Sequence, residues 1–377
     1  MEEVEEDNSG PVKSFQKHKP EEFYGMEWHE LMQKSIKTAE ELANFFEDDS
    51  LKDLKTVIEK YPMRINSYYL SLIKEKGDPI WNQAIPNKEE IEFRKLGVND
   101  PLGEEEYCPV KGLIHRYPDR VLLLVSPTCA MYCRFCTRKR KVGKTETISE
   151  KQIDAGIEYI KEHPEITDVL ISGGDPLMLE DEQLDNILSK IRTIKHVEII
   201  RIGSKVPCTM PQRVTEELVN ILKKYSPLFL NTHFNHPSEL TPLAEKALAK
   251  LADAGIPLGN QTVLMKNVND DSETLGILFK KLLKNRVKPY YLFHADLVRG
   301  TEHFRTSVKK GIDIMQNLNG HISGMAVPRY VIDAPNHGGK ICINPKTVLE
   351  SEGKKLSLKN FEGRTIEFFD IEEYPSY

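Results

Sequence analysis

The chain has 377 residues, of which 39% are hydrophobic and 29% are charged, and its net charge is −6. This composition excludes a disordered polymer and argues against a dedicated nucleic-acid-binding protein, which is normally basic. No apolar run approaches the roughly 18 residues of a membrane span, the acidic start MEEVEEDNSG does not resemble a secretory signal, and six cysteines are too few for a disulfide scaffold. We therefore expect a globular, cytoplasmic protein that binds neither membranes nor nucleic acids.

Residues 1–110 are predicted to form a tail and a helical region ahead of the main domain. Residues 1–25 are highly charged and poor in large apolar side chains, which is typical of a loose tail. Farther along, apolar residues recur at helical spacing, for example at Leu42, Phe45 and Phe46. Prolines punctuate this stretch and mark its turns.

Residues 111–335 are predicted to form an α/β fold in which short apolar strands alternate with amphipathic helices. This alternation is the pattern of βαβ units. Six units without a G-x-G-x-x-G motif after the first strand favour an incomplete (β/α)6 TIM-type barrel over a dinucleotide-binding sheet. The predicted strands begin at Val121, Asp168, Val197, Leu228, Pro257 and Pro289, and the predicted helices span 150–163, 181–194, 211–225, 240–255 and 272–285.

Polar or glycine-rich residues follow all six predicted strands. In a barrel of this kind the carboxyl ends of the parallel strands share one rim, where active sites are built. Turns and helix caps would explain one or two such loops, but six of them on one rim predict a shared pocket. The second, fourth and fifth strands lead into Ser172, Gly173, Gly174, Asp175, His233, Asn260 and Gln261.

The first predicted strand leads into a cluster of cysteines. Cys129, Cys133 and Cys136 have the spacing C-x3-C-x2-C. A closed zinc site or a ferredoxin cluster uses four protein ligands, whereas three ligands on a [4Fe–4S] cluster leave one iron open for a substrate or cofactor. A zinc site completed by a histidine stays open as an alternative. A redox pair of Cys133 and Cys136 also stays open, although it leaves Cys129 unexplained.

The pattern C-x3-C-x-aromatic-C, with Phe135 as the aromatic residue, resembles the signature of the radical S-adenosylmethionine (SAM) enzymes. The resemblance implies that the three cysteines hold a [4Fe–4S] cluster whose open iron binds SAM. One electron from the cluster then cleaves SAM to a 5′-deoxyadenosyl radical. The loop from Ser172 to Asp175 matches the family's SAM-binding loop, where glycines let the backbone approach the SAM ammonium and Asp175 can bear on that charge. We also assign three polar rim residues to cofactor binding: His233, Asn260 and Gln261.

A longer series of motifs is similar to the lysine 2,3-aminomutases. The sequences HRYPDRVLLL, CRFCTRKR, SGGDPL, NTHFNHP, ADAGIPLGNQ, HFRT and DAPNHGGK occur in one order within residues 95–345. These enzymes use pyridoxal phosphate (PLP) as well as SAM, and the resemblance implies that Lys340 forms the Schiff base with PLP. Arg116 and Arg120 align with arginines that bind the PLP phosphate, for which a bidentate guanidinium is suited. A PLP-free radical SAM isomerase stays as an alternative.

The resemblance also implies how the substrate is held. Arg138 aligns with the arginine that pairs with the substrate α-carboxylate, and Asp296 and Asp333 align with aspartates around the ε-ammonium group of lysine. Two carboxylates in one pocket repel each other unless a cation joins them, which suits lysine and opposes glutamate. The basic residues that follow Arg138 are expected on a solvated face: Lys139, Arg140 and Lys141.

These assignments together predict a lysine 2,3-aminomutase, an isomerase that transfers an amino group within one molecule. It would move the α-amino group of L-lysine from C2 to C3 through a PLP aldimine and a 5′-deoxyadenosyl radical, and so give β-lysine. Arginine would also satisfy paired carboxylates, so the same chemistry on arginine, or on glutamate, remains open.

The last predicted part, residues 336–377, comprises the loop of Lys340 and a short C-terminal tail. Family members continue into a longer tail with a cysteine-rich zinc site used in subunit assembly, but here no cysteine follows Cys342. We therefore expect no structural zinc, while a homo-oligomer remains open. The expected partners are an amino acid substrate and a one-electron donor such as flavodoxin or ferredoxin.

Overall fold

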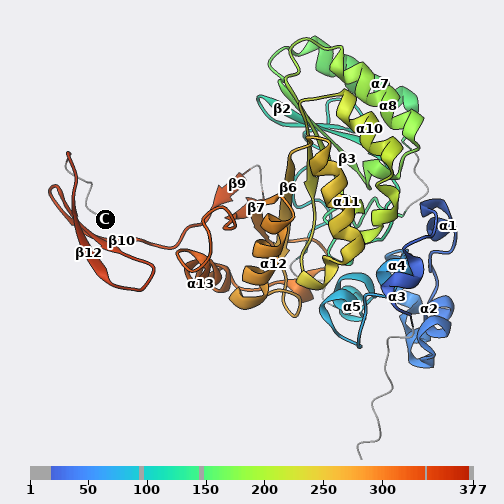
Figure 1. The fold of residues 1–377 in the computed structure, drawn as a ribbon, viewed down its shortest axis with the longest axis horizontal. Helices are drawn as coiled ribbons and strands as arrows, with labels where there is room; N and C mark the ends of the chain where they lie inside the picture. The colour runs from blue at the N-terminus through green and yellow to red at the C-terminus, as the bar shows by residue number, and fades with distance from the viewer. Residues whose placement is uncertain (1–17, 93–96, 144–147, 336–337, 373–377) are drawn as a thin grey trace, which may run out of the picture.

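The computed structural model describes residues 18–92, 97–143, 148–335 and 338–372. Figure 1 shows three parts: short helices near the N-terminus, an α/β body, and a small sheet near the C-terminus that projects from the body. The predicted incomplete α/β barrel is confirmed as the body. Within the described residues, no helix combines the length and the apolar character that a membrane crossing requires.

The body is built on a nine-stranded sheet. Its strands are β1 Leu113–Tyr117, β2 Arg120–Ser126, β3 Asp168–Gly173, β4 Ile199–Gly203, β5 Leu228–Thr232, β6 Leu258–Leu264, β7 Val287–His294, β8 Arg329–Ala334 and β9 Gly339–Cys342. Their spatial order follows the chain order; β2 to β8 run parallel, while β1 and β9 pair antiparallel at the two edges. The six predicted strands are β2 to β7, and β8 adds a seventh parallel strand.

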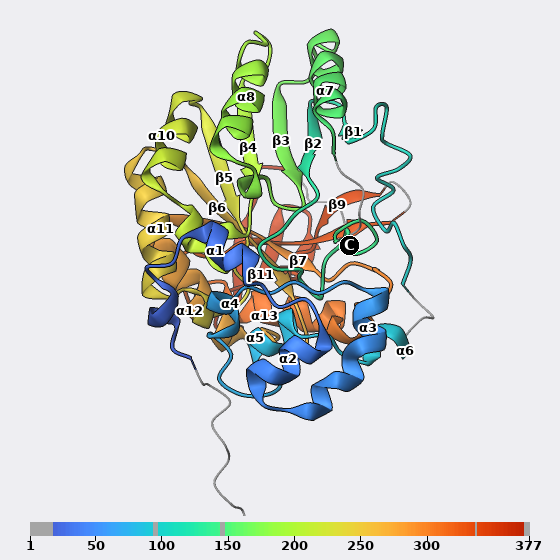
Figure 2. The same ribbon diagram turned by 90° about the vertical axis from the view of Figure 1, so that its right-hand side faces the viewer.

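Six helices connect successive parallel strands and lie along the outside of the sheet (Figures 1 and 2). They are α7 Glu150–Glu162, α8 Asp181–Arg192, α10 Glu216–Lys224, α11 Pro242–Asp253, α12 Ser272–Lys284 and α13 Val308–Leu318. Most begin at a side chain that accepts a free backbone N–H of the first turn, such as Ser149 at α7 and Asp271 at α12. All five helices predicted from hydrophobic periodicity are present.

The N-terminal region consists of short helices that share one hydrophobic core with the barrel. They are α1 Trp28–Gln33, α2 Ala39–Phe46, α3 Lys55–Lys60, α4 Ser67–Leu70, α5 Pro79–Ala84 and α6 Glu89–Glu92. One more short helix, α9, spans Val206–Thr209, and 3₁₀ helices span Pro20–Phe23, Asp49–Leu54, Pro176–Met178, Pro211–Arg213, Pro237–Glu239 and Glu302–Phe304.

The N-terminal region holds the loop that carries the three clustered cysteines, which we call the cysteine loop (residues 127–142). The Tyr132 N–H donates to the Arg64 carbonyl at 2.9 Å, and the Arg134 N–H donates to the Gln83 carbonyl at 2.9 Å. The predicted helical region therefore does more than precede the barrel, because its backbone fixes the shape of one rim loop.

The nine-stranded sheet stays open, and side chains span the gap between its two edges. From β1, Arg116 Nη1 donates to Asp333 Oδ1 at 2.8 Å, and Nη2 donates to the Ala334 carbonyl at 3.2 Å. The Lys340 N–H of β9 donates to the Tyr117 hydroxyl at 3.2 Å. We call this junction the seam.

The C-terminal sheet consists of β10 Val348–Glu352, β11 Lys355–Lys359 and β12 Thr365–Phe369, in that order and all antiparallel. We call it the arm. It stands away from the body in Figure 1. Of its large apolar side chains only Leu356 is fully buried, so the segment expected as a short tail forms an ordered but largely exposed sheet.

Candidate functional site

A single cavity of about 780 Å³ inside the half-barrel collects the residues predicted for the site. It lies against the inner faces and carboxyl ends of the parallel strands. Every predicted site residue lines it except Asn260: Cys129, Cys133, Phe135, Cys136 and Arg138 on the cysteine loop, Ser172, Gly173, Gly174 and Asp175 at β3, His233 and Gln261 at β5 and β6, and Asp296, Asp333, Lys340, Arg116 and Arg120 near β7 and the seam.

The three clustered cysteines line this cavity and are partly buried. Burial raises the pKa of the Cys133 thiol to about 12 and raises the pKa values of Cys129 and Cys136 as well. A positive metal centre is what such thiols need in order to ionise. Within the described ranges, no three His, Cys, Asp or Glu side chains are close enough to bind one metal ion. In a four-iron cluster each cysteine binds its own iron, so separated thiols suit a cluster.

The loop after β3 packs directly on the cysteine loop, and its two glycines make this contact possible. Gly173 has a φ of 139°, and a Cβ there would lie 2.3 Å from the Ser126 carbonyl oxygen. A Cβ on Gly174 would lie 2.5 Å from the Thr128 carbonyl oxygen. The Asp175 N–H donates to that same Thr128 carbonyl at 2.7 Å. Gly173 is therefore needed where the ends of β2 and β3 meet, and Gly174 is needed for the contact between the two loops.

Asp175 joins the loops after β3 and β4. Its buried carboxylate accepts hydrogen bonds from Ser204 Oγ at 2.7 Å, the Lys205 N–H at 2.7 Å and the Leu177 N–H at 3.1 Å. Burial raises its pKa to about 6. Protein donors reach both oxygens, so Asp175 positions these loops, and its predicted effect on the SAM ammonium stays a prediction.

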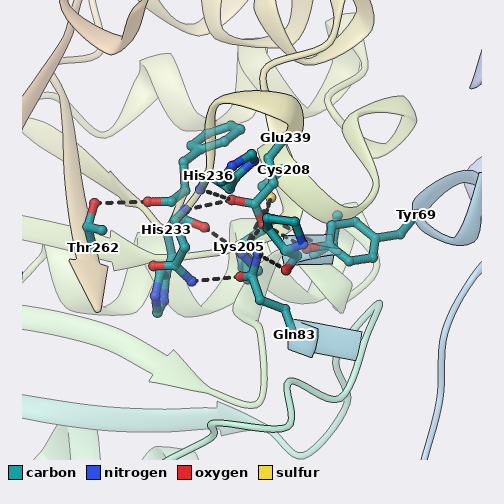
Figure 3. A network of polar contacts seen from close by, with 12 residues as sticks. Tyr69, Gln83, Lys205, Cys208, His233, His236, Glu239 and Thr262 are labelled. Atoms are coloured by element: carbon teal, nitrogen blue, oxygen red, sulfur yellow. Dashed lines mark hydrogen bonds and ion pairs between the residues drawn. The ribbon is translucent and has the colours of Figure 1, made fainter. Parts of the chain in front are cut away.

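A buried ion pair beside the cysteine loop forms the network of Figure 3. Lys205 Nζ lies 2.9 Å from Glu239 Oε1 and donates to the His233 carbonyl at 2.8 Å. The Tyr69 hydroxyl donates to the same carboxylate at 2.7 Å. Burial raises the pKa of Glu239, but Lys205 and the hydrogen bonds overcome this and hold it at about 2.

This network ties the N-terminal region to the loops after β4 and β5. The ring of His233 in turn stands edge-on to Phe135, with 5.6 Å between the centroids. No sequence pattern predicts the pair of Lys205 and Glu239, because the two residues lie in different loops and neither belongs to a recognisable motif.

A second group of buried charges holds the cysteine loop from the other side. Glu90 is fully buried; its Oε2 lies 2.6 Å from both Arg134 Nη2 and Lys139 Nζ. The two cations outweigh the effect of burial and hold the pKa of Glu90 at about 2. The expectation that Lys139 lies on a solvated face is wrong, because this ion pair encloses it, and Arg140 is also largely enclosed. Arg134 and Lys139 bracket Cys136 in the chain, so Glu90 fixes the end of the loop.

Arg138 reaches the cavity with its guanidinium already oriented by an acidic residue. Its Nη2 lies 2.7 Å from Glu104 Oε1, and its Nε donates to the same oxygen at 2.8 Å. Both side chains are mostly buried, with 17% and 5% of their surfaces exposed. Glu104 lies in the loop before β1 and was not predicted, because nothing in the sequence around it marks a site.

At the seam, Asp333 holds two cations. Its Oδ1 accepts from Arg116 at 2.8 Å and its Oδ2 lies 3.1 Å from Lys340 Nζ. The lysine ammonium also stands over the rings of Tyr117 and Phe293, at 5.4 and 5.9 Å from their centroids. Asp333 therefore orients the side chain of Lys340, the predicted Schiff-base lysine. Each carboxylate oxygen of Asp333 already has a cationic partner.

Asp296 differs from Asp333 because one of its oxygens is unpaired. Oδ1 is buried and has no hydrogen-bond partner among the described residues. Burial raises the pKa of Asp296 to about 7, and the charge of Asp333 adds to the rise, while Lys340 and Arg116 oppose it. A buried carboxyl group in this state is stabilised as an anion when a cation binds beside it.

Asn260 does not reach the cavity, contrary to its predicted contact with a cofactor. Its side chain is fully buried, accepts the Phe234 N–H at 2.7 Å and donates to the Phe234 carbonyl at 3.1 Å. It also hydrogen-bonds the hydroxyls of Thr232 and Thr262, each at 2.9 Å. Asn260 thus shapes the loop after β5, which carries His233.

The cavity wall also holds polar groups that no motif predicts. Arg201 Nε donates to Asp168 Oδ1 at 2.8 Å, and the Tyr290 hydroxyl donates to Gln261 Oε1 at 3.3 Å. Strand alternation could have found Arg201, because its neighbours on both sides in β4 face the core. Arg120 is more exposed and pairs with the adjacent Asp119 at 2.8 Å.

This chain matches two protein families and several known proteins. Residues 123–276 match the radical SAM superfamily, and residues 315–376 match a domain described as lysine-2,3-aminomutase. The L-lysine 2,3-aminomutase of Methanococcus maripaludis is 50% identical over 348 residues, covering 90% of this chain and 80% of the relative. The L-lysine 2,3-aminomutase of Acetoanaerobium sticklandii is 48% identical, covering 92% and 85%. The glutamate 2,3-aminomutase of Clostridioides difficile is 44% identical, covering 84% and 76%.

Proposed function

We propose, given that this chain belongs to the lysine 2,3-aminomutase family of radical SAM enzymes, that it moves the α-amino group of L-lysine from C2 to C3 with PLP as a second cofactor. Radical SAM membership brings a [4Fe–4S] cluster and SAM, which together supply a 5′-deoxyadenosyl radical able to take a hydrogen atom from the substrate. The electron for this step comes from a carrier such as flavodoxin or ferredoxin. The product of the reaction is β-lysine.

Cys129, Cys133 and Cys136 would hold the cluster, each through one thiolate. Their residue type fits, because soft thiolates are the usual ligands of iron–sulfur clusters. Their setting fits as well: Glu90 fixes the end of the cysteine loop, and the loop after β3 packs against its start. The protein therefore presents three ligands on a loop held at both ends.

The residues around the seam fit PLP. Arg116 has a buried Nε without a hydrogen-bond partner among the described residues, a donor that a phosphate oxygen would satisfy. Arg116 and Arg120 would bind the phosphate, and Lys340 would form the Schiff base from its position 3.1 Å from Asp333. When bound, PLP supplies a π-system that spreads the unpaired electron during amino migration.

The main observation in favour of lysine as the substrate is the buried Oδ1 of Asp296, which has no hydrogen-bond partner among the described residues. The ε-ammonium of lysine would supply the missing cation, whereas a glutamate side chain would add a third negative charge beside Asp296 and Asp333. Arg138, oriented by Glu104, would bind the α-carboxylate. One relative, a glutamate 2,3-aminomutase, is 44% identical to this chain. The proposal of lysine as the substrate therefore rests on the residues of the pocket more than on sequence identity.

The test is an anaerobic assay of the reconstituted enzyme with PLP, SAM and dithionite, run separately with L-lysine, L-arginine and L-glutamate. We expect β-lysine and no β-glutamate by mass spectrometry. Turnover of arginine or glutamate without turnover of lysine would overturn the substrate assignment. The Asp296→Asn variant should lose at least about a hundredfold in lysine turnover, because it removes the charge that pairs with the ammonium.

PLP binding has its own test. The Lys340→Ala variant should lose the visible absorbance of covalently held PLP, because Lys340 is the lysine that the described residues place at the seam. Lys309→Ala is a matched control, since Lys309 is exposed on α13 and pairs with Asp313 on the same helix. If the absorbance survived in Lys340→Ala, the Schiff-base assignment would be wrong, and if wild type bound no PLP, a PLP-free isomerase would be the better description.

A further inference from the structure

Residues 97–112, which we call the bridging segment, connect two halves of the open sheet beside the cavity. At one end, the Val98 N–H donates to the carbonyl of Leu297, in the loop after β7, at 2.8 Å. At the other end, the Gly112 carbonyl accepts the Leu124 N–H of β2 at 2.8 Å. The bridging segment therefore joins the regions around the carboxyl ends of β7 and β2, which β3 to β6 separate in the sheet.

The contact with the loop after β7 is close because residue 97 is a glycine. A Cβ on Gly97 would lie 2.5 Å from the Cα atom of Arg299, which is backbone and cannot give way as a flexible side chain could. The Arg299 N–H also donates to the Val98 carbonyl at 3.0 Å. Leu297 directly follows Asp296 in the chain. The bridging segment therefore holds the loop that presents Asp296 to the cavity.

The middle of the bridging segment holds Arg138 through Glu104. Burial raises the pKa of Glu104, but the charge of Arg138 outweighs this effect, so the pKa lies below its usual value and the carboxylate is ionised at neutral pH. Glu104 Oε1 accepts from Nε and Nη2 of Arg138, at 2.8 and 2.7 Å. This arrangement uses two of the five N–H donors of the guanidinium and leaves three for other acceptors. Both side chains line the cavity.

We propose that the bridging segment selects the length of the amino acid substrate by fixing the distance between Arg138 and Asp296, with Glu104 as the positioning residue for Arg138. This inference rests on the proposed function, in which Arg138 binds the α-carboxylate and Asp296 binds the ε-ammonium. The two side chains come from distant parts of the sheet, so the intervening strands connect them only indirectly. The bridging segment contacts both the guanidinium of Arg138 and the loop of Asp296.

A site with two fixed ends discriminates against a shorter ligand, because one of its charged groups is then left unpaired. L-ornithine is L-lysine shortened by one methylene group, and one methylene typically changes discrimination by about 10–200-fold. We therefore expect the wild type to bind L-lysine at least about tenfold more tightly than L-ornithine. The measurement is isothermal titration calorimetry of the full chain, loaded with PLP and without SAM, so that binding is read without turnover.

The role of Glu104 is tested with a ligand that lacks the α-carboxylate. Glu104→Gln should weaken binding of L-lysine by at least about tenfold, because Arg138 loses the charge that orients it. Binding of L-lysinamide, whose amide is uncharged, should change little. A merely structural role would weaken both ligands equally. The matched control is Glu105→Gln, since Glu105 is the next residue but is 68% exposed and pairs with Arg140 at 3.3 Å.

The selection of length is tested at the close contact of Gly97. Gly97→Ala should lower the preference for L-lysine over L-ornithine by at least about fivefold, because the added methyl group separates the bridging segment from the Arg299 backbone. Gly25→Ala is the matched control, since a Cβ at Gly25 meets no atom within 4 Å. If circular dichroism showed that Gly97→Ala unfolds, Glu104→Asp, which moves the anchor of Arg138 by one methylene, should lower the same preference.

The outcomes distinguish this inference from the proposed function. Equal losses for L-lysine and L-lysinamide in Glu104→Gln, or no loss, would refute the role of Glu104. A wild type that binds L-ornithine as tightly as L-lysine would refute the selection of length and leave the proposed function standing, and so would an unchanged preference in a folded Gly97→Ala variant. A wild type that binds no L-lysine would overturn the proposed function and this inference with it.

Discussion

The buried pair of Lys205 and Glu239 allows a sharp test of what holds the loops around the cavity. Glu239→Gln removes the negative charge and leaves the Lys205 ammonium with only neutral acceptors, chiefly the His233 carbonyl at 2.8 Å. Lys205→Met removes the positive charge, but Glu239 then keeps the Tyr69 hydroxyl and two backbone N–H donors. The glutamine variant should therefore be the more damaging of the two.

The structure sets the size of the effect. The pKa of Glu239 falls from 4.5 to about 2, which corresponds to about 3 kcal/mol in favour of the ionised form in the folded protein. Removing one partner of a buried pair typically costs about 3–5 kcal/mol, because the other charge stays uncompensated. We expect Glu239→Gln to lower the free energy of unfolding by about 4 kcal/mol and Lys205→Met by about 2 kcal/mol. The double variant leaves neither of these two charges unpaired. Its loss in free energy of unfolding should therefore be smaller than the sum of the losses of the two single variants.

The assay is equilibrium urea unfolding of the cluster-free protein, followed by circular dichroism and by the fluorescence of Trp28 and Trp81. A double-mutant cycle should give a coupling of about 2 kcal/mol between the two sites. If the losses in free energy of unfolding of the two single variants simply added in the double variant, the view that the pair is held by charge would be refuted. A loss below about 1 kcal/mol for Glu239→Gln would refute it as well. The contribution of Glu239 to the free energy of unfolding should persist above pH 4.5, where this carboxyl group is ionised in the unfolded chain. It should disappear as the pH falls towards 2.

Three further predictions concern other parts of the site. Glu90→Gln should lower the free energy of unfolding by about 3–5 kcal/mol and reduce iron incorporation, measured by urea unfolding and iron analysis, because Arg134 and Lys139 lose their buried counter-charge. Calorimetry at several pH values should show lysine binding weaken below about pH 7, as Asp296 takes up a proton, and this dependence should vanish in Asp296→Asn. Asn260→Leu should cost about 3 kcal/mol in urea unfolding with no direct loss of a cofactor contact, since its amide bonds only loop and strand groups; unchanged stability would contradict this.

The barrel could be predicted from sequence because each of its parallel strands buries alternate side chains while the others line the cavity. Strands β2 to β7 read as short, mostly apolar runs separated by amphipathic helices, a pattern that indicates βαβ units. The arm gave no such signal. Its strands KLSLK and TIEFF alternate apolar with polar residues over only five positions and leave one face exposed, so no continuous apolar run marks them.

The site was predictable where chemistry is carried by a local motif. The three cysteines and the glycine loop are each marked by a few neighbouring residues, and the shared rim of the parallel strands brings them together. Lys340 has no such local mark and was assigned through the family resemblance. The ion pairs that hold these groups could not be read in the same way. Glu90 lies far from Arg134 in the chain, and Glu104 lies far from Arg138, so only the folded barrel determines which acid meets which base.

Lys340 lies on a strand at the seam that is held less firmly than the central strands of the sheet. Its strand, β9, is an edge held by β8 on one side and by the hydroxyl of Tyr117 on the other. Separating those contacts breaks a few hydrogen bonds worth about 1 kcal/mol each and leaves the ladders of β2 to β7 intact. Local opening there requires far less free energy than global unfolding, so β9 amides should exchange with deuterium sooner than those of β5. The seam thus places Lys340 on an edge of the half-barrel whose local opening leaves the core strands intact.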